Sequence, residues 1–119
     1  MSYTLLNRDD PSIESFRDAF YKIRRALGTT AFGINEVRLA PDFEGVEHDE
    51  SDTGHEEVYL VLDGGGTFTV DGEVVPVAKG DYLRVDATTV RKAVAGGEGL
   101  HFIVVAGKPQ PEYDGRPSL

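Results

Sequence analysis

The side chains best suited to chemistry stand around the start of one apolar segment, residues 58–62. His48 and Glu50 lie in the acidic stretch before it, residues 42–56, and Glu57 immediately precedes it. One imidazole and two carboxylates can hold Fe(II), Mn(II) or Zn(II) if all three converge. A strand over 58–62 would present Glu57, and the acidic loop would have to bring His48 and Glu50 to it.

Arg91, His55 and His101 are the other side chains that can serve such a site. Arg91 cannot be a metal ligand because a guanidinium is never neutral, but it suits a carboxylate or phosphate group of a bound molecule. His55 has the parity of Glu57 and can act as an acid or base if both point inward, although a position at the loop edge in water is favoured. His101, alone in an apolar strand, is interpreted as a core or rim residue and as the reserve candidate for a further imidazole.

The composition excludes several classes of function. The 119 residues suit one domain, and the absence of cysteine excludes disulfides, zinc–thiolate sites and thiol nucleophiles. A net charge of −9 does not suit nucleic-acid binding. The N-terminal sequence lacks the pattern of a signal peptide, and no apolar run reaches membrane-spanning length. We therefore expect a cytoplasmic protein whose partner is a small molecule, not nucleic acid or a membrane.

One helix is predicted, over about residues 11–27. Asp10 can cap it, Pro11 suits its first turn, and Gly28 can end it. An apolar stripe at helical spacing supports it, made of Ile13, Phe16, Phe20, Ile23 and Leu27. We expect this stripe to pack against the rest of the domain or against a second subunit.

From residue 30 onward the pattern indicates short strands separated by glycine-rich turns. The predicted strands are 31–39, 58–62, 67–70, 73–77, 82–85, 90–94 and 100–105. Asp71-Gly72 between two of them is a strong signal for a two-residue hairpin. About seven short strands after one helix predict a sandwich or barrel. The proline-rich tail, residues 107–119, is expected to be loosely attached.

The order of these segments resembles the cupin superfamily, whose members are jelly-roll barrels also called double-stranded β-helices. Its first motif runs G-x5-H-x-H-x3,4-E-x6-G, and here Glu57 and Gly64 have the right separation. Its second runs G-x5-P-x-G-x2-H-x3-N, and here Gly80 begins it while Arg91 takes the place of the histidine. The resemblance spans about residues 37–106. It implies a single all-β cupin domain over 1–119, in which a barrel at about 30–106 follows the N-terminal helix in the sequence.

In metal-binding cupins, two histidines and the glutamate of the first motif, with the histidine of the second, hold the ion. Three registers put different pairs at the first two positions: Ser51 and Thr53, Glu50 and Asp52, or His48 and Glu50. The third is preferred, because it resembles the H-x-E of a branch of small cupins. The favoured interpretation is that the metal is absent or weakly bound, with Arg91 replacing its charge and pairing with Glu57 or Glu50. The alternative is a dioxygenase- or isomerase-like enzyme that binds Fe, Mn, Ni or Zn through His48, Glu50 and Glu57.

The expected function is therefore the binding of a small anionic or polar molecule inside the barrel. Tyr59 shares the face of Glu57 and should line this interior, and Arg91 should meet Glu57 there. No catalytic residue is assigned. The opposite face of the same strand carries Val58, Leu60 and Leu62, which are too apolar for water. A homodimer that covers this outer face is the expected assembly.

Overall fold

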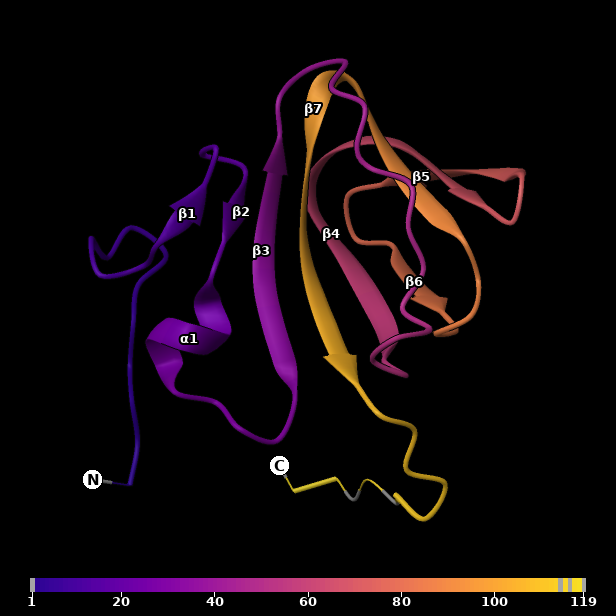
Figure 1. Cartoon of the computed structure of the whole chain (residues 1–119). Helices are drawn as coiled ribbons and strands as arrows, with labels where there is room; N and C mark the ends of the chain where they lie inside the picture. The colour runs from indigo at the N-terminus through magenta and orange to yellow at the C-terminus, as the bar shows by residue number, and fades with distance from the viewer. Residues whose placement is uncertain (1, 114, 116, 119) are drawn as a thin grey trace.

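The computed structural model describes residues 2–113, 115, 117 and 118, and its framework is one antiparallel sheet of seven strands (Figure 1). The elements are β1 Ser15–Phe16, β2 Phe20–Tyr21, α1 Ile23–Leu27, β3 Gly33–Leu39, β4 Glu56–Val70, β5 Glu73–Ala78, β6 Tyr82–Val85 and β7 Arg91–Gly107. The sheet order is β1-β2-β3-β7-β4-β5, and β6 pairs with β4. This largely antiparallel β architecture is consistent with a jelly roll.

The two long strands, β4 and β7, change partners along their length, and the sheet curls around them (Figure 1). The first part of β4 pairs with β6 on one side and with the end of β7 on the other. Its second part pairs with β5 and with the start of β7. On its free edge, the start of β7 bonds to residues 43–48, which we call the 43–48 segment. One strand thus carries Glu57 while another carries Arg91, and the curl brings them together.

The core lies on the concave side of the curled sheet and is built around three aromatic rings. Tyr59, Phe68 and Phe102 contact one another, with ring centroids 4.7–5.6 Å apart. Val61 and Leu100 are also fully buried beside them. Alternation along β4 explains this arrangement, because residues 57, 59 and 61 share the inner face. The aromatic cluster fills the centre and leaves the polar end of that face, at Glu57, near the rim.

The predicted long helix is wrong, because only Ile23–Leu27 is helical. Arg17 and Asp18 adopt positive φ values of 55° and 50° and turn the chain back, so that Ser15–Phe16 pairs with Phe20–Tyr21. Phe20–Tyr21 then extends the sheet by pairing with β3. Pairing with an existing strand thus overrides the helical spacing of the apolar stripe. No helix in the described part of the chain is long and apolar enough to cross a bilayer.

The predicted strands over 58–62 and 67–70 are one strand, and so are those over 90–94 and 100–105. The glycine-rich stretches between them are irregularities inside continuous strands and not turns, with register shifts between Val61 and Asp63 and between Gly64 and Gly66. A side chain at Gly66 would overlap the carbonyl oxygen of Val94, so close passage of two strands requires this glycine.

The remaining strand predictions are confirmed. The strand over 31–39 corresponds to β3, and those over 73–77 and 82–85 correspond to β5 and β6. Asp71 and Gly72, with φ values of 46° and 84°, form the predicted two-residue hairpin between Val70 and Glu73. In the tail, residues 108–112 are exposed and outside any helix or strand, and residues 114, 116 and 119 lie outside the described part.

Candidate metal and ligand site

His48 reaches the site because the 43–48 segment is hydrogen-bonded to β7. The backbone N–H of His48 donates to the carbonyl of Arg91 at 2.9 Å, and that of Arg91 donates back to the carbonyl of His48 at 2.8 Å. This reciprocal pair fixes His48 directly beside Arg91 in the extended sheet. The imidazole remains partly open to solvent, with 44% of the side chain exposed.

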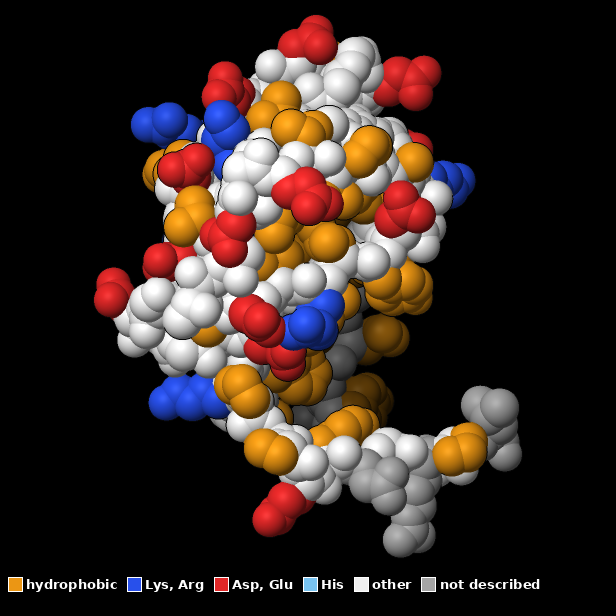
Figure 2. Space-filling view, turned by 90° about the vertical axis from the view of Figure 1, so that its right-hand side faces the viewer, with side chains coloured by type: hydrophobic (Ala, Val, Ile, Leu, Met, Phe, Trp, Pro, Cys, Tyr) orange, Lys and Arg blue, Asp and Glu red, His pale blue; other side chains and the backbone are white. Residues whose placement is uncertain are grey.

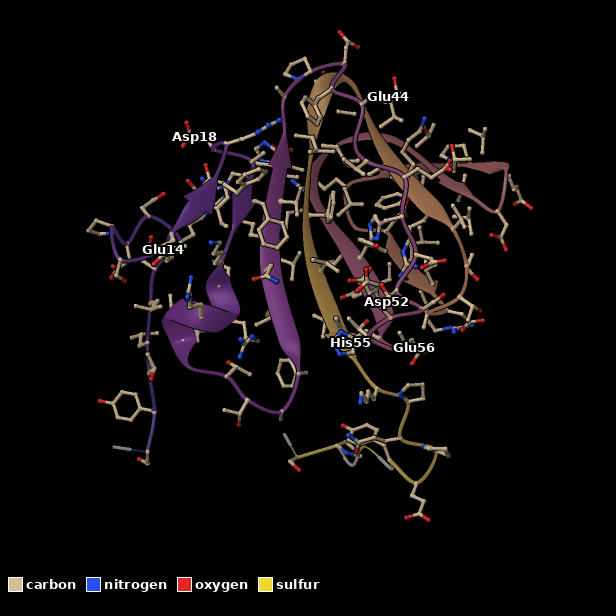
Figure 3. The ribbon with its side chains drawn as sticks, viewed as in Figure 1. Glu14, Asp18, Glu44, Asp52, His55 and Glu56 are labelled. Atoms are coloured by element: carbon tan, nitrogen blue, oxygen red, sulfur yellow. The ribbon has the colours of Figure 1, made fainter. Side chains whose placement is uncertain are left out.

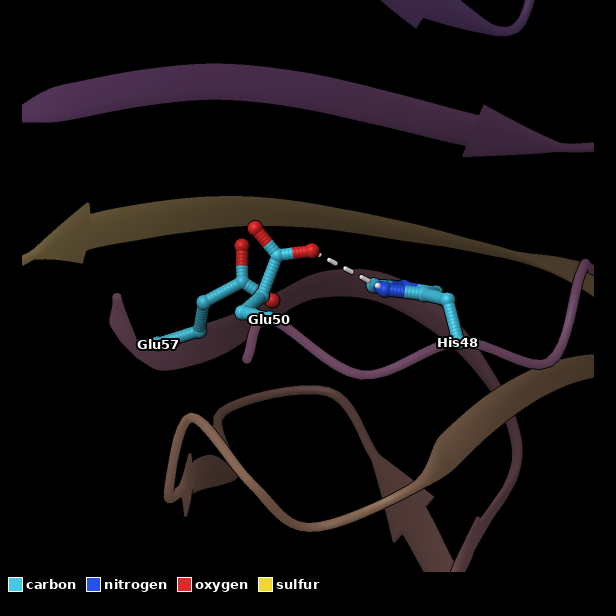
Figure 4. Close-up of side chains that lie close together, drawn as sticks. All are labelled: His48, Glu50 and Glu57. Atoms are coloured by element: carbon cyan, nitrogen blue, oxygen red, sulfur yellow. Dashed lines mark hydrogen bonds and ion pairs between the residues drawn. The ribbon is translucent and has the colours of Figure 1, made fainter. Parts of the chain in front are cut away.

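Glu50 is positioned by the turn that follows. Its backbone N–H donates to the carbonyl of Ala87 at 2.8 Å, and its own carbonyl accepts from the N–H groups of Thr53 and Gly54. The hydroxyl of Thr53 also lies 3.2 Å from Glu50 Oε1. The turn therefore aims the Glu50 carboxylate back toward His48, whose Nδ1 is 3.1 Å from Glu50 Oε2 (Figure 4).

Glu57 stands on the inner face of β4 and is almost buried. Its Oε1 accepts hydrogen bonds from the hydroxyl of Tyr59 at 2.6 Å and from Nη2 of Arg91 at 3.0 Å. The predicted ion pair between Glu57 and Arg91 is therefore confirmed. Because both donors use Oε1, the second oxygen remains available to a further partner.

Arg91 is 1% exposed, and the fold engages each of its three nitrogens. Nε donates to the Tyr59 hydroxyl at 3.2 Å, and Nη2 bonds to Glu57. Nη1 donates to the carbonyl of Thr89 at 2.8 Å and lies 3.4 Å from that of Asp86. A guanidinium held in this way has its charge matched by Glu57 and its donors matched by the loop before β7.

The pKa shifts in this network follow from burial and pairing. Burial raises the pKa of Tyr59 well above its usual value, and the nearby charge of Glu57 and its hydrogen bond add to that effect. For Arg91, burial opposes the charge, but hydrogen bonds and charge interactions with Tyr59 and Glu57 outweigh it and raise the pKa. Both groups therefore keep their protons, so Tyr59 is a hydrogen-bond donor to Glu57 and not a base.

The three candidate ligands converge. One donor atom each from His48, Glu50 and Glu57 can be chosen so that all lie within 4.8 Å of one another (Figure 4). Two donors of one ion lie at most about 4.4 Å apart, because each metal–ligand distance is near 2.0–2.2 Å. A small movement of the side chains would therefore bring all three donors to one ion. The charge around the site also favours a cation. The net charge of the chain is −9, and more acidic than basic side chains lie on the face of the molecule that Figure 2 shows.

Comparison with known proteins identifies the fold family. Residues 35–111 match the model of the Cupin domain family. The chain belongs to the cupin family. No curated protein matches it.

Several solved structures share the fold of this cupin. A cupin protein from Bacteroides fragilis has a TM-score of 0.76 and 24% identity, covering 98% of this chain and 92% of that one. KdgF from Halomonas sp. has a TM-score of 0.66 and 18% identity, over 84% and 88% of the two chains. A predicted oxalate decarboxylase from Thermotoga maritima has a TM-score of 0.62 and 24% identity, over 73% and 76%. At these identities the likeness concerns the fold alone.

Not every residue predicted for the site of this cupin joins it. His55 stands just before β4, at its lower end, near Glu56 (Figure 3). Its N–H bonds to Thr53, and its ring is not among the converging donors. His101 pairs across the strands with Arg38 and Asp63, and its buried neighbours at 100 and 102 face inward. The structure therefore places His101 on the outer face, so it is not a third imidazole in the interior.

Two features were missed by the sequence reasoning. One is the 43–48 segment, which was expected to be part of an acidic loop over residues 42–56 and instead bonds to β7. The other is a second charge cluster on the outer face, where the buried carboxylate of Glu36 binds both Arg8 and Arg38. The signal for the second was available, because Glu36 and Arg38 alternate with apolar Val37 and Leu39 at the end of the strand over 33–39. Alternation alone, however, does not identify Arg8 as a partner.

Proposed function

We propose that this cupin binds a divalent transition metal ion through His48, Glu50 and Glu57, and that a small polar molecule binds at the same place. The observation that carries the proposal is the convergence of the three donor atoms within 4.8 Å. One imidazole and two carboxylates suit Mn(II), Fe(II) or Zn(II). Bound there, such an ion supplies a Lewis acid that polarises an oxygen atom of the molecule beside it.

The hydrogen bonds around Arg91 make metal binding at this site more favourable than the sequence alone suggested. A free guanidinium would repel a cation, but this one is paired with Glu57 and hydrogen-bonded to main-chain carbonyls. Among the described residues, the one basic partner of the Glu50 carboxylate is His48, which must be neutral to bind a metal. Two carboxylates against one engaged arginine leave a net negative site.

The same network bears on the expectation that Arg91 receives an organic anion. That expectation stays a prediction, and the geometry weighs against it, because a ligand would have to displace Glu57 or a carbonyl from a side chain that is 1% exposed. His48 and Glu50 are the open groups, with side chains 44% and 23% exposed. They suit a ligand that carries hydroxyl or carbonyl oxygens and little negative charge.

Metal titration of chelator-treated protein tests the proposal. We expect Mn(II) or Zn(II) to bind at one ion per chain in isothermal titration calorimetry. The variants His48→Ala and Glu50→Gln should each weaken binding by at least about tenfold, since even a residue that only orients a ligand is worth that much. His101→Ala is the matched control, because it removes an imidazole from the outer face. Absence of stoichiometric binding, or equal affinity of His48→Ala and the parent protein, would refute the proposal.

A metal-free ligand site is the second candidate, and one observation favours it. The site can balance its own charges, with Glu57 paired to Arg91 and Glu50 in contact with His48. A small polar molecule would then bind the open groups by hydrogen bonds alone. A molecule that shifts the melting temperature equally with and without chelator would support this candidate over the first.

We also propose that the curled sheet closes into a barrel and that two copies associate through its outer face. Val58 and Leu60 on that face are only half-buried, and their strand partners Val105 and Tyr82 are 37% and 74% exposed. A second copy would cover this apolar surface. Light scattering should give twice the chain mass at micromolar concentration, and Tyr82→Glu should lower it to that of a monomer.

A further inference from the structure

A cavity of about 140 Å³ lies on the opposite side of the sheet from the His48–Glu50–Glu57 site. It separates the N-terminal segment, residues 2–32, from the outer face of β3 and β7. Figure 1 shows this segment and α1 beside β3, well away from β5 and β6. The lining residues of the cavity are Leu6, Asn7, Arg8, Ile13, Ile23, Leu27, Ile34, Asn35, Glu36 and Ile103. None of them takes part in the site described above.

Most of the cavity wall is aliphatic. Ile23 and Leu27 are four residues apart on α1 and present one side of the helix. Ile34 and Ile103 come from the outer face of the sheet, since Ile103 pairs with Glu36 and Ile34 precedes Glu36 by two. The volume is close to that of an engineered aliphatic cavity of about 150 Å³ that binds benzene. A ligand with one six-membered ring therefore fits the space.

One end of the cavity is polar and offers both donors and acceptors. Arg8 donates from Nη2 to Glu36 Oε2 at 2.6 Å, and Arg38 uses the same oxygen. Both arginines therefore donate to the same oxygen of Glu36, a residue that is 5% exposed. The other carboxylate oxygen of Glu36 can accept a hydrogen bond from a further donor. Half-exposed Arg8 retains further N–H groups, and Asn7 also lines the cavity.

This polar end selects for a neutral group. The charges at this end balance, because Arg8 and Arg38 are matched by Glu36 and by the nearby carboxylate of Asp9. A charged ligand would therefore find no unbalanced opposite charge to repay the loss of its hydration. A hydroxyl can accept from Arg8 and donate to Glu36. We propose that this cavity is a second binding site, for a small uncharged alcohol or phenol of about one ring.

Phenol is the probe, and a titration followed by amide chemical shifts in ¹H–¹⁵N spectra is the test. We expect saturable shifts at Leu27, Ile34 and Ile103, with a Kd on the order of 1 mM for so small a ligand. Toluene, which has the same shape without the hydroxyl, should bind about fivefold more weakly, the ratio that one net hydrogen bond gives. Benzoate should also bind more weakly than phenol.

Cavity-filling variants test the location. Ile103→Phe and Leu27→Phe fill the space from opposite walls and should each abolish the saturable shifts. Val105→Phe is the matched control, because it enlarges a residue on the same face of β7 outside the cavity. The proposal is overturned if phenol causes no saturable shift at the lining residues, if toluene binds as tightly, or if both filled variants bind phenol unchanged. Should a variant not fold, the shift map of the parent protein and the toluene comparison still decide.

Discussion

Replacing Arg91 by alanine tests whether the buried pair with Glu57 organises the site. The side chain of Arg91 is 1% exposed and that of Glu57 is 11% exposed. Removing one member of a buried pair leaves the other charge without compensation, which costs about 3–5 kcal/mol. Glu57 would retain the hydrogen bond from Tyr59. We therefore expect the lower end, a loss of about 3 kcal/mol in the free energy of unfolding.

Urea denaturation at pH 7, followed by far-ultraviolet circular dichroism, measures this loss. For a domain of this size, the loss corresponds to a fall of about 10 °C in melting temperature. The m-value should not change, because the surface exposed on unfolding stays the same. A double variant, Arg91→Ala with Glu57→Gln, should lose less than the sum of the single variants, since no charge remains unpaired.

Lys92→Ala is the matched control for Arg91→Ala. Lys92 is the next residue of β7 and pairs with the exposed carboxylate of Glu44, so its removal should have a much smaller effect. If Arg91→Ala were no more destabilising than Lys92→Ala, the Arg91–Glu57 pair would be solvated or apart in solution. The reasoning that treats Arg91 as the fixed internal cation of the site would then fail.

Two further predictions concern Tyr59 and Gly66. The pKa of Tyr59 is raised on folding, so its contribution to stability is complete below the ordinary tyrosine pKa of about 10 and is lost as the pH rises above it. Between pH 9 and 11, Tyr59→Phe should therefore lose less stability in urea denaturation than the parent protein, whereas exposed Tyr82→Phe should follow the parent; a parallel fall in all three would contradict this. Gly66→Ala should cost about 1–3 kcal/mol in the same assay, because the new methyl group overlaps the Val94 carbonyl. Gly97→Ala, with open space around it, should lie within about 0.5 kcal/mol of the parent, and equal losses would show that strand spacing is not the reason.

Local signals in the sequence were sufficient for most of the strands. The Asp71-Gly72 hairpin was predictable because both residues suit positive φ values, and its flanking strands alternate as the turn requires. The prediction of a helix over 11–27 was wrong because Phe20 and Tyr21 pair with β3. The spacing of apolar residues along the sequence contains no information about such a distant partner. Gly64 to Gly66 was interpreted as a turn because glycine marks bulges and turns alike.

The residues of the candidate site were predictable in part, since His48, Glu50 and Glu57 converge but His55 and His101 lie elsewhere. The balance of charges was not predictable. Glu57 and Arg91 were expected to pair because each takes a family motif position, and they do. The carbonyls of Thr89 and Asp86 that also hold Arg91 depend on how the loop before β7 folds back, which no spacing encodes. Because these contacts occupy Arg91, it is a poorer candidate for binding a ligand than His48 and Glu50, which are more exposed.

The central place of β7 bears on how the protein is made. Its residues emerge from the ribosome after all the other strands, yet β7 lies between β3 and β4 in the sheet and also bonds to the 43–48 segment. Until Arg91–Gly107 is synthesised, β3 and β4 have unpaired edges that can bind other nascent chains. Folding must therefore wait for nearly the whole described chain. A chain truncated before residue 107 would lack part or all of the middle strand of the sheet. Its exposed strand edges would have to be bound by a chaperone, or the chain degraded by a protease.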